Sequence, residues 1–379
     1  YEQAVEEVWL NQRTQVKECT LRDTTNRHGR LAEAIVKAKA DKMTITVESV
    51  EATPQQVLVS SDGANIRLTN GEWREVKTVV IGEFESQWNE KASKTEVKTR
   101  NLSYFSRSYS VREFEQYALP ELYERGVFNA AKVVTVNDGA QWIQSFVDYH
   151  IPKATRILDF RHALDHILAA GQVVLGERTE GTQQWFSMMA HQLKHKPPQH
   201  TIAAIGLLKS QATTEEQVAA VDNERRYLQK RIALIDYPHF QNKGYPLGSG
   251  SVESSHKLVV HSRMKQAGMR WADHNIDPML ALRNLVCNGR WSEGWQEIVA
   301  FHWDECRREI RELARRQRPS APLIPVTFAD VKVASINKEE DQGCSQPITP
   351  PQKQAACRPA DDHPWKRNIW PTKEAWRWN

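Results

Sequence analysis

The sequence predicts an α/β protein with a mixed sheet that is interrupted by an all-helical insertion and preceded by a small helical segment. Three observations support this fold class. Short apolar runs bounded by turn residues begin near Gln55 and are typical of strands. Between His162 and Gly248 the strand pattern disappears and helical spacing takes over. Residues 1–50 show helical patterns separated by short polar breaks.

The N-terminal segment contains one stretch that could read DNA. From Gln15 the pattern is helical, and Gly29 is expected to stop the helix. This helix could be the second helix of a helix-turn-helix, or it could be a plain amphipathic helix. The residues fit both interpretations.

Three strands are expected to follow in succession. Gln56 to Gly63 is an apolar run that ends in an Asp-Gly turn signal. Residues 74–84 form its expected hairpin partner after the Asn70-Gly71 turn. Residues 101–109 are the third expected strand.

Helices and strands then alternate. Ser110 is expected to cap a helix that ends before Gly126. Residues 132–136 form a buried strand that ends at Asp138, and a helix follows it. Residues 156–159 are a short fifth strand, after which a helix begins near residue 161. Three strands followed by helix, strand, helix and strand is the element order of a ribonuclease-H-like sheet.

The remaining sequence is predicted to be helical and then irregular. Thr213 and Thr214 open a helix whose apolar residues keep helical spacing. Ser251 is the expected N-cap of a helix that carries Glu253 in its first turn. We expect the following segments: 1–50 helical, with a partial helix-turn-helix; 51–162 first part of the catalytic domain; 163–247 all-α insertion; 248–318 last part of the catalytic domain with basic helices; 319–379 a Pro- and Trp-rich tail.

Composition excludes several classes of protein. The 379 residues are 40% hydrophobic and 26% charged, which indicates a folded core rather than wholesale disorder. No apolar run reaches the roughly 18 residues that a membrane helix needs, so no membrane partner is expected. The five cysteines are dispersed without a CxxC pair, which argues against a disulfide framework or a zinc cluster and favours a reducing cytoplasm. Because the first residue is Tyr1 rather than Met, we expect further sequence upstream.

Basic residues cluster in two places, although the formal net charge is only +4. Between His256 and Trp271 the chain has no acidic residue. This first group is expected to face DNA, and its basic members are Lys257, Arg263, Lys265 and Arg270. A second group of arginines, between residues 307 and 318, is diluted by glutamates and is typical of a solvated helix.

Three carboxylates lie where a metal-dependent site would need them. Asp62 and Asp138 follow the first and fourth expected strands, which are neighbours in a ribonuclease-H-like sheet, and Glu253 begins a nearby helix. Phosphodiester chemistry commonly uses two divalent cations held by such carboxylates. Taken singly, each has an ordinary explanation, because Asp-Gly is a common turn and a helix dipole favours an early glutamate.

Three sequence blocks resemble a known family. SSDGA (Ser60 to Ala64), VNDGAQWI (Val136 to Ile143) and GSGSVESSHKLVVHSRMKQAGMRW (Gly248 to Trp271) are similar to the signature blocks of bacterial DDE transposases of the ISKra type, which are relatives of the Mutator-like elements. DFRH (Asp159 to His162) resembles the DxxH element of that family, and the similarity spans residues 1 to 310.

The resemblance implies a function and roles for several residues. Asp62, Asp138 and Glu253 would bind two Mg²⁺ ions, for which Mn²⁺ can substitute. Asp159 and His162 would be accessory residues near the site, and 163–247 would be the helical insertion of the family. The N-terminal part is shorter than is usual in this family, which puts recognition of the transposon ends by this chain in doubt.

Some alternatives stay open at the level of sequence. Asp159 also ends a strand and competes with Asp138 for the role of second carboxylate. His162 could hydrogen-bond Asp159, contact DNA or simply pack. Trp271 could stack on an exposed base or belong to the core.

The expected activity is hydrolysis of a phosphodiester at each transposon end, followed by attack of the released 3′-hydroxyl on target DNA. We expect DNA as partner, at least a dimer on DNA, and a location on the bacterial nucleoid. The competing functions are a catalytically inactive, co-opted DNA-binding protein and a purely hydrolytic nuclease.

Overall fold

The computed structural model describes residues 1–43, 55–90 and 94–316. Residues 1–318 belong to one compact unit. The predicted C-terminal tail, 319–379, lies outside the described residues, as does the end of the N-terminal segment from residue 44 to residue 50.

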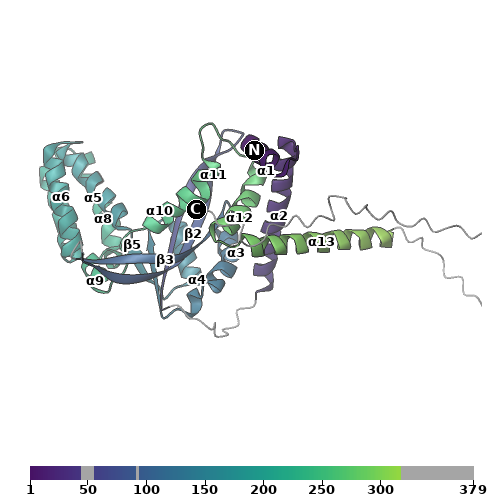
Figure 1. The fold of residues 1–379 in the computed structure, drawn as a ribbon. Coiled ribbons are helices and arrows are strands. Elements are labelled where there is room, and N and C mark those ends of the chain that lie inside the picture. Colours follow the sequence, from purple (N-terminus) through teal and green to yellow (C-terminus); the bar gives the residue numbers. More distant parts are fainter. Residues whose placement is uncertain (44–54, 91–93, 317–379) are drawn as a thin grey trace, which may run out of the picture. The chain divides into compact units, whose positions relative to one another are not determined.

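A five-stranded mixed sheet forms the centre of the fold, with the strand order β3-β2-β1-β4-β5 (Figure 1). β1, β2 and β3 are antiparallel neighbours, whereas β4 runs parallel to β1 and β5 runs parallel to β4. The α/β class and the adjacency of the first and fourth strands are therefore confirmed. The strands are β1 (Gln56–Arg67), β2 (Trp73–Asn89), β3 (Lys94–Arg107), β4 (Lys132–Asn137) and β5 (Thr155–Leu158).

The prediction that the first strand ends in a turn at Asp62 is wrong. β1 continues through Asp62 to Arg67, and Asp62 pairs with Thr78 of β2. The ladder with β2 supplies the hydrogen bonds that a turn would otherwise provide. The missing side chain of Gly63 leaves room for the Glu75 side chain, whose carboxylate a Cβ at this position would displace. The hairpin turn lies at Asn70-Gly71, as predicted, where Gly71 has a φ of 90°.

Side chains alternate between the two faces of the sheet. On one face, Val57 and Val59 pack with helices α3 (Val111–Glu124) and α4 (Gln141–His150). On the other face, Leu58 packs with the helices of the insertion, and Ile66 packs with the helices that follow it.

The insertion is entirely helical, as predicted. Its helices are α5 to α9, and those labelled in Figure 1 lie together at the left of the picture. They are α5 (Phe160–Leu175), α6 (Glu180–His195), α7 (Pro198–Leu207), α8 (Glu215–Lys230) and α9 (Tyr237–Asn242).

In Figure 1 the other helices lie away from the insertion, and α13 extends to the right of the sheet. They are α1 (Glu2–Gln12), α2 (Glu18–Lys42), α10 (Gly250–Ser255), a π-helical turn η4 (His256–His261), α11 (Ser262–Met264), α12 (Ile276–Cys287) and α13 (Trp291–Arg316). Short 3₁₀ turns are η1 (Val127–Asn129), η2 (Leu208–Gln211), η3 (Ile232–Leu234) and η5 (Asp273–Asn275).

Two predicted helix boundaries are wrong and one is confirmed. α2 continues past Gly29, where the missing side chain lets the helix approach Pro278 of α12 closely. Ser249, not Ser251, precedes α10, and no side chain caps that helix. Ser110 forms the predicted capping box with Glu113.

The described helices include none that is both long enough and apolar enough to cross a membrane.

Candidate functional site

Asp62 lies on β1, and Asp138 directly follows the neighbouring strand β4. β1 and β4 pair in parallel as far as Val59 and Thr135, and beyond this ladder the Ser61 backbone N–H donates to Oδ1 of Asn137 at 2.7 Å, next to the two aspartates. Asp62 lies four residues after Leu58, and Asp138 lies four residues after Val134. Leu58 and Val134 belong to one apolar cluster on the same face of the sheet. Adjacent strands lie about 4.8 Å apart, so Asp62 and the residue that follows β4, Asp138, are neighbours despite their separation in sequence, and the charge of Asp138 acts on Asp62.

The two aspartates occupy a polar gap between two apolar clusters on that face. The cluster beneath the insertion contains Leu58 and Val136. The second cluster, under α10 to α12, contains Ala64 and Ile66. Asp62 lies between Leu58 and Ala64 along β1, and its side chain retains 34% of its exposure. The gap is therefore open to solvent, while buried apolar clusters lie on both sides of it.

The electrostatics of Asp62 show that the carboxylates are close together. The pKa of Asp62 is raised from 3.8 to about 6, chiefly by burial and further by the charges of Asp138, Glu253 and Glu75, while a hydrogen bond from the Gly63 backbone opposes the rise. Asp138 and Glu253, the other two carboxylates of the predicted site, therefore lie near enough for their charges to act on Asp62. The structure also adds Glu75 of β2, which sequence reasoning did not single out.

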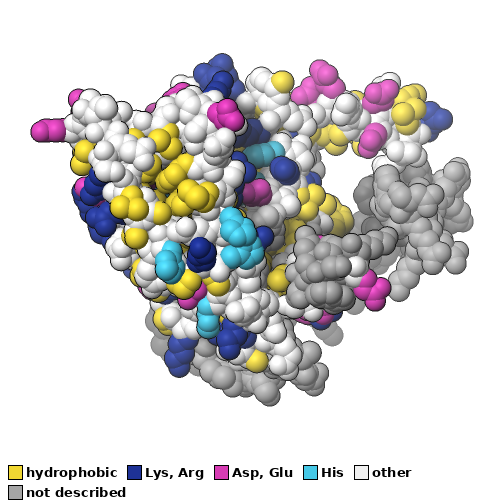
Figure 2. Space-filling view, turned by 90° about the vertical axis from the view of Figure 1, so that its left-hand side faces the viewer, with side chains coloured by type: hydrophobic (Ala, Val, Ile, Leu, Met, Phe, Trp, Pro, Cys, Tyr) yellow, Lys and Arg dark blue, Asp and Glu magenta, His cyan; other side chains and the backbone are white. Residues whose placement is uncertain are grey.

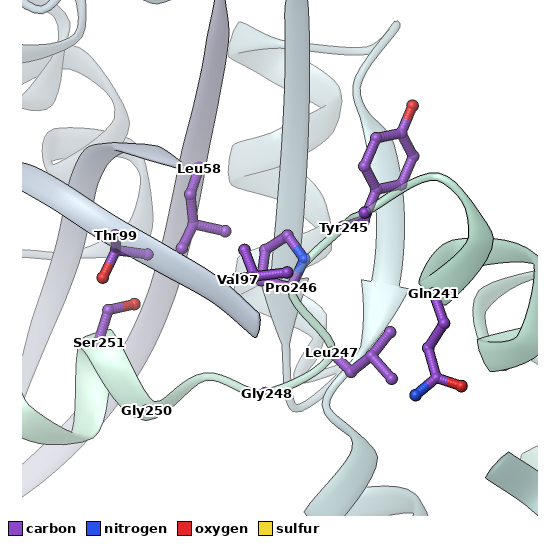
Figure 3. A pocket seen from close by; sticks show the side chains of 11 residues that line it. Leu58, Val97, Thr99, Gln241, Tyr245, Pro246, Leu247, Gly248, Gly250 and Ser251 are labelled. Carbon is purple, nitrogen blue, oxygen red and sulfur yellow. The ribbon is translucent and has the colours of Figure 1, made fainter. Parts of the chain in front are cut away.

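Glu253 lies in the first turn of α10 with its side chain exposed. The Gly248–Ser251 segment that leads to it borders a cavity of about 570 Å³, which Leu58, Val97 and Thr99 also line. Figure 3 shows Gly248 and Gly250 passing below these strand residues and Ser251 facing Thr99. None of the three carboxylates lines this cavity, so it adjoins the candidate site without containing it.

Asp159 has a structural role, which favours Asp138 as the second carboxylate of the proposed site. Its Oδ1 accepts a hydrogen bond from the backbone N of His162 at 2.9 Å and caps α5. Its Oδ2 accepts one from the backbone N of Ser249 at 2.5 Å. The side chain is buried, and both oxygens are used to join the start of the insertion to the segment that carries Glu253.

His162 approaches the site through a tyrosine. Its Nε2 lies 3.2 Å from the hydroxyl of Tyr227, and that hydroxyl donates to the backbone carbonyl of Asp138 at 3.0 Å. Burial, followed by the charge of His166, lowers the pKa of His162, although Asp138 and Asp159 oppose the shift. His162 is therefore a packed residue near Asp138 and not a free surface histidine.

His256 is a neighbour of Asp62 that sequence reasoning missed. Its Nδ1 lies 3.4 Å from Oδ2 of Asp62. Burial, followed by the charge of His261, lowers the pKa of His256 to about 4, so the ring that touches Asp62 at neutral pH is uncharged. The signal in the sequence was its position three residues after Glu253, because residues three apart lie on the same side of a helix.

The predicted DNA-binding residues lie on and after the π-helical turn. Lys257, Lys265 and Arg270 are exposed, and Arg263 is half-buried. Within the described part of the chain none of the four forms an ion pair with a carboxylate. Burial, followed by the charges of Lys265 and Lys257, lowers the pKa of His261, so both lysines lie near this histidine. π-helical turns are rare and occur frequently at functional sites.

Trp271 belongs to the core. Only 8% of it is exposed, it packs in the cluster with Ile66 and Met264, and its indole N–H donates to the Met264 carbonyl at 3.1 Å. The interpretation of Trp271 as a platform for an exposed base is therefore not favoured by its position. The guanidinium of Arg263 lies 5.5 Å from the centre of its ring.

Figure 2 shows the side of the molecule that carries the insertion. Hydrophobic side chains gather on one part of this face, and His, Lys and Arg side chains lie beside them around a hollow.

The donor chemistry of the site suits a hard divalent cation, because carboxylate oxygens are the ligands that Mg²⁺ prefers. One oxygen of Asp62 accepts from the Gly63 N–H and one of Asp138 accepts from the Ala140 N–H, each leaving further lone pairs. Glu253 is exposed and unconstrained at its tip. Across residues 1–43, 55–90 and 94–316, however, no three His, Cys, Asp or Glu side chains are already assembled tightly enough to hold one metal ion. The chemistry of these carboxylates fits a divalent metal ion, and Asp62, Asp138 and Glu253 are the residues that would hold it.

Comparisons with protein-family models, with curated proteins and with solved structures find no match.

Proposed function

We propose that this protein is a DDE transposase with a ribonuclease-H-like catalytic domain, which cleaves DNA at transposon ends and joins them to target DNA. The observation that carries the proposal is the convergence of Asp62, Asp138 and Glu253 from β1, β4 and α10. The strand order with β1 beside β4 supports the same interpretation.

The carboxylates act as ligands in this proposal. Asp62 and Asp138 would hold metal from the face of the sheet, and Glu253 would complete the site from α10. Two Mg²⁺ ions, when bound, would supply activation of the attacking oxygen and stabilisation of the leaving oxygen. The uncharged ring of His256 contacts Asp62 and adds no positive charge that would compete with a metal ion.

The basic residues would hold the DNA. Lys257, Lys265 and Arg270 are exposed close to Glu253 in the sequence, and they can reach phosphates without giving up an internal ion pair. Phosphate contacts supply affinity that is independent of sequence and falls with salt. The protein would therefore bind DNA even when its chemistry is blocked.

The test is a Mg²⁺-dependent strand-transfer assay with Glu253→Gln. The donor duplexes carry the DNA that flanks the coding region of this chain, with free 3′-hydroxyl ends, and the target is a plasmid. We expect joined product from the wild-type chain and at least a ~10³-fold loss with Glu253→Gln, whereas DNA binding, followed by fluorescence anisotropy, stays within about twofold.

The matched control is Glu177→Gln, which makes the same chemical change at an exposed position of the insertion. It should join DNA like the wild-type chain. Nicked but unjoined product would identify a purely hydrolytic nuclease, and retained binding without any product would identify a co-opted DNA-binding protein. Equal product from Glu253→Gln and the wild-type chain would remove Glu253 from the site.

A further inference from the structure

The turn that carries Asp138 is held by Tyr227 of helix α8 and by Arg231, the residue that follows this helix. The Tyr227 hydroxyl donates to the Asp138 carbonyl at 3.0 Å. Nη2 of Arg231 donates to the Gly139 carbonyl at 3.4 Å. Tyr227 and Arg231 are four residues apart and therefore lie on the same face of the helical chain. Two successive carbonyls of the turn are thus bound by two side chains from one edge of the insertion.

The side chain of Tyr227 is fixed by its neighbours. The guanidinium of Arg231 lies 3.7 Å from the centre of its ring, and the ring of His166 stacks on it at 3.8 Å. His166 is in turn bound by Glu224, whose Oε2 lies 2.5 Å from Nδ1 of the histidine. Stacking and hydrogen bonding together restrict the rotamer of Tyr227, so its hydroxyl is held at one position.

Gly139 shows how closely the clamp approaches the backbone. Its φ of 83° favours glycine, and a Cβ at this residue would meet the Tyr227 hydroxyl at 2.8 Å and Nε of Arg231 at 3.1 Å. The Asp-Gly pair therefore has a second requirement beyond turn geometry. Because Gly139 has no side chain, Tyr227 and Arg231 can contact the main chain of the turn.

We propose that Tyr227 and Arg231 are positioning residues for Asp138. Through them the helical insertion fixes the position of the Asp138 carboxylate at the proposed catalytic site. This inference rests on the proposed function for its catalytic consequence. The clamp itself concerns only contacts of Tyr227 and Arg231 with the Asp138-Gly139 turn. Partners that orient a metal ligand commonly change metal affinity or activity by about 10- to 100-fold when they are lost.

The first arm of the test measures the turn directly. Tyr227→Phe removes one hydroxyl and keeps the stacked ring, and Tyr149→Phe makes the same change at an exposed tyrosine on α4. Hydrogen exchange of residues 137–141 is followed by mass spectrometry in both variants. We expect faster exchange in Tyr227→Phe, including the Ala140 amide that bonds Asp138, and no change in Tyr149→Phe.

The second arm measures the consequence for the site. We expect the Mg²⁺ concentration for half-maximal strand transfer to rise roughly tenfold in Tyr227→Phe, with little change in the maximal rate at saturating Mg²⁺. Arg231→Lys keeps the charge but loses the planar group and should give a smaller rise. A merely structural role would lower the melting temperature and leave the Mg²⁺ requirement unchanged.

Two outcomes would overturn the inference: unchanged exchange of the turn, or faster exchange with an unchanged Mg²⁺ requirement. If the wild-type chain joins no DNA, the proposed function fails, and the second arm becomes a calorimetric titration of DNA-free protein with Mn²⁺. Weaker Mn²⁺ binding by Tyr227→Phe than by Tyr149→Phe would then support the clamp, and equal or absent binding in all three proteins would refute its positioning role.

Discussion

Asp62 is a carboxylate whose negative charge is unfavourable in the folded chain. Its pKa of about 6 lies above its ordinary value of 3.8, because burial and the neighbouring carboxylates disfavour ionisation. Between these two pH values the folded chain holds a proton that the unfolded chain has released. The stability contributed by protonated Asp62 is thus present below about pH 4 and is lost as the pH rises through about 6.

Asp62→Asn should therefore stabilise the protein at pH 7 in EDTA. We expect a gain of about 1–2 kcal/mol in the free energy of unfolding, which is less than the full shift implies because the side chain is one-third exposed. The gain should vanish near pH 4. Urea denaturation of both proteins across this pH range measures it, and a gain that is equal at pH 4 and pH 7 would contradict the electrostatic cause.

Metal should reverse the effect if the three carboxylates bind it. Adding Mg²⁺ at pH 7 should raise the melting temperature of the wild-type chain and leave that of Asp62→Asn nearly unchanged, since a ligand stabilises only the state that binds it. An equal rise in both proteins would place Mg²⁺ elsewhere.

Among the elements, α5 and the segment before α10 depend on each other through Asp159. Asp159 follows β5 directly, caps α5 and accepts a hydrogen bond from the Ser249 backbone N–H. It thereby connects the entrance and the exit of the insertion. The DxxH pattern that drew attention to it in the sequence has a structural explanation here, because the aspartate is a cap and His162 is the residue whose amide it binds.

Asp159→Asn should cost stability more than it costs metal binding. An amide can replace one of the two acceptors but leaves the second backbone N–H facing an N–H₂ group, so we expect a loss of about 1–3 kcal/mol. Asp138→Asn should show the opposite pattern, with metal binding lost and stability largely kept. Urea denaturation together with Mn²⁺ titration distinguishes the two, and equal behaviour of both variants would reopen the choice between these aspartates.

At the scale of the whole molecule, α13 presents a second apolar side. Gly294 and Ile298 are buried, and the exposed side chains Val299, Trp303, Ile310 and Leu313 follow a different stripe. With half-buried Cys306, their spacing alternates between four and three residues, as in the a and d positions of a helix that pairs with another helix. This is a surface through which the proposed dimer can form.

Ile310→Lys combined with Leu313→Lys should therefore weaken self-association. We expect light scattering after size exclusion to show a dimer for the wild-type chain and a shift towards monomer for the double variant, by at least about tenfold in the dimer dissociation constant, with the melting temperature of dilute protein unchanged. Arg308→Lys is a control on another side of the helix. A wild-type monomer whose melting temperature falls in the double variant would show instead that the stripe is covered within one chain.

Periodicity and local signals predicted the order of elements well. Apolar alternation placed the strands, Ser110 and Gly126 marked the ends of α3, and Asn70-Gly71 marked the hairpin, because these signals depend on neighbouring residues. The same signals failed at Asp62-Gly63 and at Gly29. There, glycine serves a close approach to Glu75 or Pro278, and a partner that is distant in sequence overrides the local preference for a turn or a stop.

The sequence by itself determined the α/β class and the helical insertion, because these depend on patterns of neighbouring residues, and it predicted the three carboxylates of the proposed site from Asp-Gly and Gly-Ser blocks. Only the tertiary structure decided that Asp159 is a cap, that His256 touches Asp62, and that Tyr227 and Arg231 hold the Asp138 turn. Each of those contacts joins segments whose approach depends on how the sheet and the insertion pack. Side-chain roles that arise from such packing leave no periodic signal along the chain.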